Sequence, residues 1–217
     1  MRKLLTYTAA VAVLIFMTTA QAWDQGDWIG RLGASNIAPD DPNGSILGLD
    51  ITVDDEWGVT FNGEYMLREN WGLELLAALP YEHDIKVDTL GKVGSTKHLP
   101  PTLSVNYHFL PDAKFQPYIG AGLNFTIFFD DEEDGTLKDI GGTLELEDDT
   151  SFGLAGQIGA DWIINDKWFV NFNFRYIDID TEAKVFVPDP IVAGGGTVKA
   201  DVDIDPFLYG LHVGYKF

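Results

Sequence analysis

Apolar and polar residues alternate with a period of two along much of the chain. In segment 168–176 every second residue is aromatic or apolar, and most residues between them, such as Asn171 and Arg175, are polar. Successive side chains of a strand point to opposite faces, so this pattern predicts strands with one apolar face. Eight segments show it: 28–35, 57–65, 71–79, 99–109, 115–128, 152–162, 168–176 and 207–217. Most have the length, roughly 9–11 residues, that a strand needs to cross a bilayer.

A soluble sandwich or a lipocalin would also alternate, but two features of these strands favour a membrane barrel. The faces opposite the apolar ones are small and polar, as a narrow lumen requires. Aromatic residues also sit at the ends of the apolar faces, as in the interfacial girdles of membrane barrels. These are Trp57, Trp71, Phe109, Trp162, Trp168 and Phe217.

The connections between the predicted strands alternate between short and long. The short turns are 68–70, 110–114 and 164–167, and the long connections are 36–56, 80–98, 129–151 and 178–205. Short periplasmic turns and long outer loops are typical of bacterial outer-membrane barrels. The sequence therefore predicts an all-β fold, an eight-stranded antiparallel transmembrane β-barrel with four long loops outside the cell.

The first 22 residues have the composition of a secretory signal peptide. Arg2 and Lys3 form a positive start, an apolar run follows, and Ala20-Gln21-Ala22 is a small-x-small cleavage site. The run is too short for a membrane anchor. We expect residues 1–22 to be removed on export and residues 23–217 to form one outer-membrane barrel domain.

Composition and charge exclude several function classes. The chain has no cysteine, which excludes disulfide scaffolds, thiol catalysis and cysteine-ligated metal centres. With 14 Lys+Arg against 34 Asp+Glu, the formal charge is −20, which argues against nucleic acid as a partner. Acidic runs at 130–134 and 145–149 suit either a divalent-cation site or a solvated loop, and the lack of calcium-loop spacing favours the solvated loop. No cofactor is expected.

Five motifs, in order along the chain, resemble the outer membrane protein W family, which includes AlkL-type proteins. They are ELLAALP at 74–80, HLPPTL at 98–103, PYIGAGLN at 117–124, YIDIDT at 176–181 and GYKF at 214–217. The resemblance covers essentially the whole mature chain. It implies an eight-stranded barrel with an apolar interior channel, associated with the passage of small hydrophobic molecules.

Charged residues of both signs fall on the inward face of the predicted strands. Uncompensated buried charge is costly, so Arg31 and Arg175 are expected to pair with Glu64, Glu74 or Asp161. An eight-stranded barrel is narrow enough for such a network to plug it. We expect these residues to seal the periplasmic half, so that any ligand path lies nearer the outer end.

Prolines mark the outer ends of the third and fourth predicted strands. Pro80, Pro100 and Pro101 donate no ladder hydrogen bond, so they either end the strands or open the barrel wall sideways toward the bilayer. The family resemblance favours the opening. We expect its lining to come from apolar residues around the prolines: Leu76, Ala78, Leu79, Tyr81, Leu99, Phe128 and Phe129.

The sequence thus predicts a monomeric outer-membrane channel for passive uptake of small hydrophobic solutes, surrounded by lipid and lipopolysaccharide. One alternative is a surface receptor or adhesin that acts through its long acidic loops. A less favoured alternative is an acyl-transfer or esterase enzyme that uses Ser95, His98 and Asp84 or Asp88, but no nucleophile-elbow motif accompanies these residues.

Overall fold

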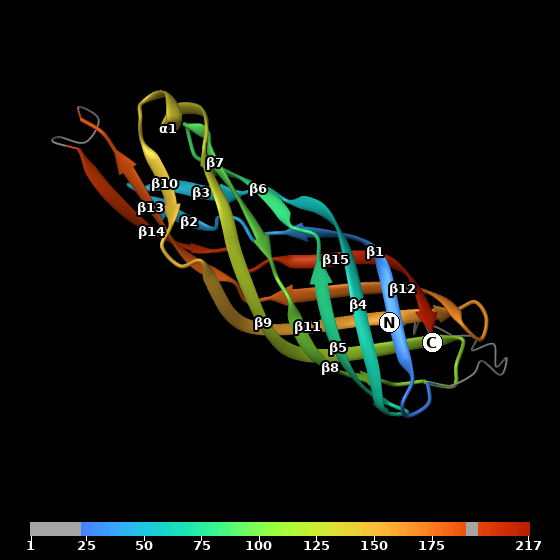
Figure 1. Cartoon of the computed structure of the whole chain (residues 1–217). Helices are drawn as coiled ribbons and strands as arrows, with labels where there is room; N and C mark the ends of the chain where they lie inside the picture. Colours follow the sequence, from blue (N-terminus) through green and yellow to red (C-terminus); the bar gives the residue numbers. More distant parts are fainter. Residues whose placement is uncertain (1–22, 190–194) are drawn as a thin grey trace, which may run out of the picture.

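Eight long antiparallel strands close into a barrel in the computed structural model, which describes residues 23–189 and 195–217 (Figure 1). The closure runs through the β8–β9 and β15–β1 pairs, and confirms the predicted fold. In order around the barrel, the strands are β1 (Trp28–Ala38), β4 (Glu56–Arg68), β5 (Trp71–Ala78), β8 (Thr102–His108), β9 (Phe115–Glu133), β11 (Thr150–Ile163), β12 (Trp168–Ile177) and β15 (Phe207–Lys216). The predicted signal peptide, 1–22, lies outside the described residues.

The long connections are mostly strands, not loops as predicted. They build a sheet that continues the barrel wall outward from β9, in the order β9-β7-β6-β3-β2-β14-β13-β10 (Figure 1). We call these added strands, the outer part of β9 and helix α1 the extension. Its elements are β2 (Gly44–Ile46), β3 (Leu49–Val53), β6 (Tyr81–Val87), β7 (Gly91–Leu99), α1 (Gly135–Asp139), β10 (Thr143–Leu146), β13 (Asp180–Val187) and β14 (Gly196–Asp203).

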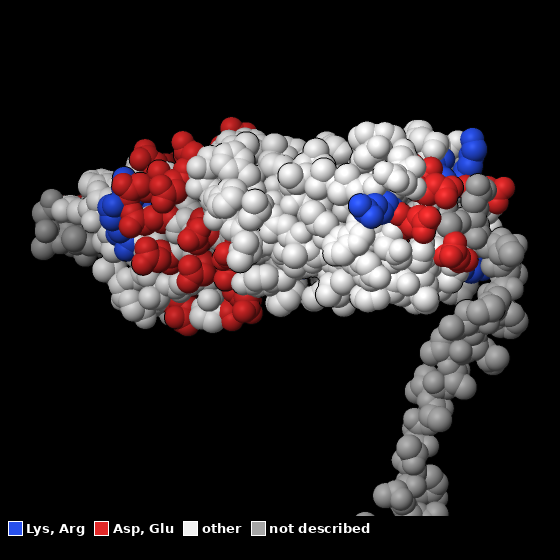
Figure 2. Space-filling view, turned by 90° about the horizontal axis from the view of Figure 1, so that it is seen from below, with Lys and Arg blue, Asp and Glu red and all other residues white. Residues whose placement is uncertain are grey.

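The outer surface of the barrel is apolar over a broad band. Leu32, Phe152 and Leu154 are each at least 60% exposed there. Tilted or edge-to-face aromatic pairs such as Trp28–Tyr65 and Trp168–Tyr215 lie toward the short-turn end. On the face that Figure 2 shows, a largely uncharged band separates a dense group of acidic side chains at one end from a smaller group of acidic and basic side chains at the other. A belt of this kind matches the hydrocarbon core of a bilayer and its aromatic girdles.

No helix in the described part of the chain is long and apolar enough to span a membrane.

The interior changes character along the barrel axis. Trp23, Ile29, Met66, Ile163 and Phe169 form a small apolar cluster near the short turns. Polar and charged side chains fill the barrel above this cluster. A second and larger apolar cluster fills the upper barrel and the extension. The molecule therefore has a polar barrel centre below an apolar outer interior.

Candidate functional site

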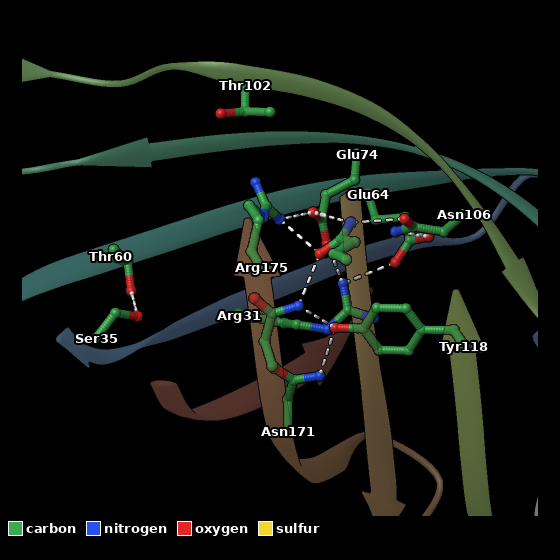
Figure 3. A network of polar contacts seen from close by, with 12 residues as sticks. Arg31, Ser35, Thr60, Glu64, Glu74, Thr102, Asn106, Tyr118, Asn171 and Arg175 are labelled. Carbon is green, nitrogen blue, oxygen red and sulfur yellow. Dashed lines mark hydrogen bonds and ion pairs between the residues drawn. The ribbon is translucent and has the colours of Figure 1, made fainter. Parts of the chain in front are cut away.

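Arg31 of β1 stands at the centre of a buried ion-pair network. Its Nη1 atom lies 2.7 Å from Glu64 Oε2 and 3.2 Å from Glu74 Oε2, and its Nη2 atom lies 2.8 Å from Asp161 Oδ2. All four side chains are fully buried. The carboxylates come from β4, β5 and β11, so one guanidinium joins strands on different sides of the barrel (Figure 3).

Arg175 of β12 extends the network outward. Its Nη2 atom donates to Glu74 Oε1 at 2.6 Å and to Gln157 Oε1 at 2.7 Å. Asn106 donates to Glu64 Oε1 at 3.0 Å, and Asn171 donates to Asp161 Oδ1 at 2.8 Å. The structure thus brings together Arg31, Glu64, Glu74, Asp161 and Arg175 in one cross-section, which we call the plug.

A neutral polar layer lies beside the plug. Ser35 and Thr60 hydroxyls lie 2.8 Å apart, and Thr60 Oγ1 lies 2.8 Å from His212 Nε2. Asn124 donates to Thr102 Oγ1 at 3.1 Å. These two sets of hydrogen bonds lie in addition to those of the plug, so the barrel centre is closed by polar contacts over more than one level.

The extension encloses two apolar cavities that share part of their lining. The inner cavity measures about 40 Å³ and the outer one, near the tip, about 160 Å³. Both are bounded by Ile46, Val87, Val93 and Val185. Leu47 and Leu90, which are exposed at the tip, also border the outer cavity. Apolar surface therefore continues from the tip into the extension.

A stack of three rings stands at the inner side of these cavities. The rings of His83 and His98 are nearly parallel with centroids 4.9 Å apart, and the Tyr81 centroid lies 5.8 Å from that of His98. His98 also contacts Phe128. Burial raises the pKa of Tyr81 well above its ordinary value and lowers the pKa of both histidines. All three rings are therefore uncharged at neutral pH.

The barrel wall is interrupted next to this stack. The β5–β8 ladder ends at the pair Leu76–Thr102, and pairing resumes only at Tyr81–His98, between β6 and β7. The stretch between contains the prolines, which supply no N–H to the ladder. Tyr81 packs inside, against Gly58 of β4, where a Cβ atom would lie 2.4 Å from the Tyr81 ring. We call this interruption the wall gap.

The structure separates the residues expected to line the outer path. Leu76, Tyr81 and Phe128 are buried in the apolar cluster, and Ala78 packs against it. Pro100 is buried at the wall gap, Pro101 is half-buried and Pro80 is exposed.

Three of the predicted lining residues point the other way. Leu79 is 54% exposed and shares the outer face with Leu75. Leu99 pairs with Ile127, which is itself exposed, while the neighbouring pair His98–Phe128 is buried. Phe129 follows Phe128 and is half-buried on the outer face. Strand alternation places all three outside because their neighbours point inward.

The sequence pattern does not reveal several cavity-lining residues, because it predicts loops at 36–56 and 80–98. Ile46, Val53, His83, Ile85 and Val87 all line the inner cavity. A signal was present, since Tyr81, His83, Ile85 and Val87 alternate with Glu82, Asp84 and Lys86. The many acidic residues concealed this period-two pattern.

The residues of the alternative enzyme hypothesis do not assemble. Ser95 lies opposite Asp84 in the β6–β7 ladder, and among the described residues His98 Nε2 has no hydrogen-bond partner. His98 is instead held between aromatic rings. A nucleophile and a base need direct hydrogen-bond contact.

Two carboxylates of the first acidic run are engaged by the protein itself. Asp131 accepts hydrogen bonds from Thr96 Oγ1 at 2.6 Å and from the Leu146 amide at 3.0 Å. Asp134 caps α1 and pairs with Lys92, whose pKa rises to about 12 through hydrogen bonds to Asp84 and Asp134. In residues 23–189 and 195–217, no group of three or more His, Asp or Glu is arranged to hold a metal ion.

Comparisons with known proteins agree with this architecture. A family model described as "OmpW family" matches residues 24–217. The chain is 37% identical over 219 residues to outer membrane protein W of Vibrio cholerae, which covers 95% of this chain and 97% of that protein. The chain belongs to the OmpW family. The resemblance noted from the sequence motifs is therefore confirmed.

Other OmpW-family likenesses extend to solved structures and to more distant proteins. The crystal structure of OprG from Pseudomonas aeruginosa matches with a TM-score of 0.83 at 36% identity, over 91% of this chain and 99% of that chain. A protein of P. aeruginosa named "Dibenzothiophene metabolism operon protein PahQ" is 26% identical over 222 residues, 97% of this chain and 98% of that protein. As a member of this family, the chain is a β-barrel of the Gram-negative outer membrane.

Proposed function

We propose that this OmpW-family barrel takes up small apolar solutes at its outer tip and releases them sideways through the wall gap into the bilayer. The proposal depends on one observation, which is that three features lie at the same height along the barrel axis. The apolar interior of the extension ends at Tyr81 and Leu76, the plug and its polar layer close the barrel below, and the β5–β8 ladder stops at the same height.

The apolar path favours uncharged solutes on physical grounds. Burial of apolar surface stabilises a bound solute by roughly 25 cal/mol per Å², so a narrow dry path holds small apolar molecules without strong polar contacts. The acidic surface of the extension disfavours anions (Figure 2). The name of the relative PahQ, which refers to dibenzothiophene metabolism, supports the same solute class.

The plug makes the sideways exit the favoured one. A solute that continued toward the periplasm would have to displace Arg31, Arg175 and their carboxylate partners, all of them buried. Breaking such pairs leaves uncompensated buried charge, which is strongly unfavourable. Leaving through the wall gap requires only movement of the apolar side chains around the prolines.

Transport is proposed in preference to catalysis because the His98 ring stacks on His83 and its Nε2 atom has no hydrogen bond to a nucleophile among the described residues. One chain closes its own barrel, so we propose a monomer, surrounded by outer-membrane lipid and lipopolysaccharide.

The test is uptake by cells that produce Leu76→Arg. Leu76 faces inward at the top of β5, where a charged side chain would meet desolvation inside the apolar path. We expect slower uptake of a small aromatic hydrocarbon and unchanged uptake of a sugar. Leu76→Met keeps the position apolar and serves as the matched control. Unchanged hydrocarbon uptake at equal protein level would contradict the proposal and favour a receptor that acts through the extension surface.

A further inference from the structure

The outer cavity of the extension is built from all four segments that the sequence predicts as long connections. Leu49 comes from the β2–β3 hairpin, Leu90 from the turn between β6 and β7, Leu137 from α1 and Val187 from β13. Among the described residues, Thr136 brings the only hydroxyl group to this lining, and it donates to the Leu90 carbonyl at 3.3 Å. The cavity therefore offers a solute apolar surface and no free hydrogen-bonding side chain.

The size of the outer cavity suits a single six-membered ring. Its volume is about 160 Å³. An engineered protein cavity of about 150 Å³, lined by leucine, isoleucine and phenylalanine, stays dry and binds benzene. The inner cavity, at about 40 Å³, is far smaller. A solute of the size of benzene therefore fits the outer cavity, and it passes inward only when the shared lining of the two cavities moves.

Leu47, at the tip beside this cavity, occupies a turn position that ordinarily takes glycine or asparagine. Leu47 and Gly48 join β2 to β3, and both have positive φ, 52° and 81°. Two-residue hairpin turns of this kind favour Asn-Gly, and a bulky residue with positive φ is strained. Leu47 is also 69% exposed. Neither the backbone conformation nor burial within the protein accounts for a leucine here, which points to contact with an apolar molecule from outside.

We infer that the outer cavity binds one monocyclic hydrocarbon of the size of benzene and excludes fused-ring hydrocarbons, with Leu47 as the apolar contact at its entrance. Burial of apolar surface supplies the binding free energy, because the lining offers no other interaction. The exclusion follows from volume, since forcing extra atoms into a packed interior is unfavourable. This inference rests on the proposed uptake function, because it names the size class of solute that the same path takes.

The test compares benzene with naphthalene, which carries a second fused ring. The protein is placed in lipid nanodiscs with isotope-labelled methyl groups, and NMR follows the resonances of Leu137 and Ile140, which border the outer cavity. Leu154, on the outer surface of the barrel, reports solute that is dissolved in the lipid. We expect benzene to shift the cavity resonances to saturation. Naphthalene should bind there roughly tenfold more weakly, because it overfills the cavity.

Variants separate cavity volume from folding. Leu137→Ala enlarges the outer cavity and should admit naphthalene, detected at Ile140, a gain of binding that a loss of folding would not produce. Leu146→Ala removes the same atoms from the inner cavity alone, so it is the matched control and should still exclude naphthalene. Leu47→Asn suits the backbone of the turn, so the hairpin should remain folded while benzene binding weakens several-fold.

Equal binding of naphthalene and benzene at Ile140 in the wild-type protein would overturn the inference and leave the proposed uptake intact. The same holds if benzene shifts only Leu154 while the protein still speeds benzene uptake by cells. Exclusion of naphthalene from folded Leu137→Ala would overturn the claim that volume sets the limit, and unchanged benzene binding in Leu47→Asn would overturn the role of Leu47. No binding at the cavity, together with no protein-dependent benzene uptake, would overturn the proposed function as well.

Discussion

At the residue scale, the plug was predictable and the ring stack was not. The inward positions of Arg31 and Glu64 follow from strand alternation, and the cost of buried charge requires that they pair. The choice of three carboxylates for Arg31, and of Glu74 as the bridge to Arg175, depends on the register of strands distant in sequence. His83 and His98 could not be brought together from a segment interpreted as a loop.

Replacing Arg31 with Met should strongly destabilise the barrel. The substitution leaves Glu64, Glu74 and Asp161 without their shared cation, and removing one partner of a buried pair costs about 3–5 kcal/mol. Urea unfolding in lipid vesicles would measure the change. Arg68→Met, at the exposed end of β4, is the matched control and should stay within about 0.5 kcal/mol of wild type. Similar stability of both variants would show that the plug contributes little.

Acidification should loosen the extension locally. Burial, and to a lesser extent the nearby His83, lower the pKa of His98 well below its ordinary value of 6.5. The unfolded segment therefore binds a proton that the folded one does not. The free energy of opening the extension is therefore highest above about pH 6.5. Below this pH it falls by up to about 1.4 kcal/mol per pH unit for each histidine.

Amide hydrogen exchange of β6 and β7 in bicelles, corrected for intrinsic rates, would measure this opening. His98→Phe should reduce the pH dependence while keeping the ring contact with Phe128. An opening free energy in the wild type that is constant from about pH 7 to pH 5 would contradict the argument.

At the element scale, the barrel strands were predicted closely and the extension was not. The predicted strand 99–109 is divided in the structure, because Pro100 and Pro101 separate β7, which ends at Leu99, from β8, which begins at Thr102. The structure also extends β9 beyond the predicted end at Phe128. Half-buried and exposed residues alternate from Phe129 to Glu133, where the strand ends. Turn lengths and aromatic ends define the membrane strands, but acidic residues on the exposed face conceal strands that lie outside the membrane.

Replacing Pro100 and Pro101 together with alanine should narrow the wall gap. Alanine restores two backbone N–H groups, which lets the β5–β8 ladder extend beyond Leu76–Thr102. We expect several-fold slower uptake of an apolar solute and new exchange protection near Ala77. Pro111→Ala, in a short turn, is the control. Newly protected amides with unchanged uptake would show that solutes do not leave through the wall gap.

At the scale of the whole molecule, the barrel and the extension share one strand of their walls. β9 belongs to both the barrel and the extension, so the apolar upper interior sits directly on the plugged barrel (Figure 1). The barrel and its membrane were predictable because bilayer thickness constrains strand length and turn pattern. The distance over which the apolar interior extends beyond the barrel could not be predicted, because it depends on how seven short strands pair with one another.

The central claim is that an apolar solute enters the bilayer before it reaches any water below. Vesicles with lipopolysaccharide in the outer leaflet, containing the protein, would carry a fluorescence acceptor attached either to lipid or to a protein in the enclosed water. After a fluorescent apolar solute is added outside, we predict that the barrel speeds its arrival at the lipid-attached acceptor, and that the enclosed acceptor responds only later. Acceleration at the enclosed acceptor ahead of the lipid-attached one would contradict the account.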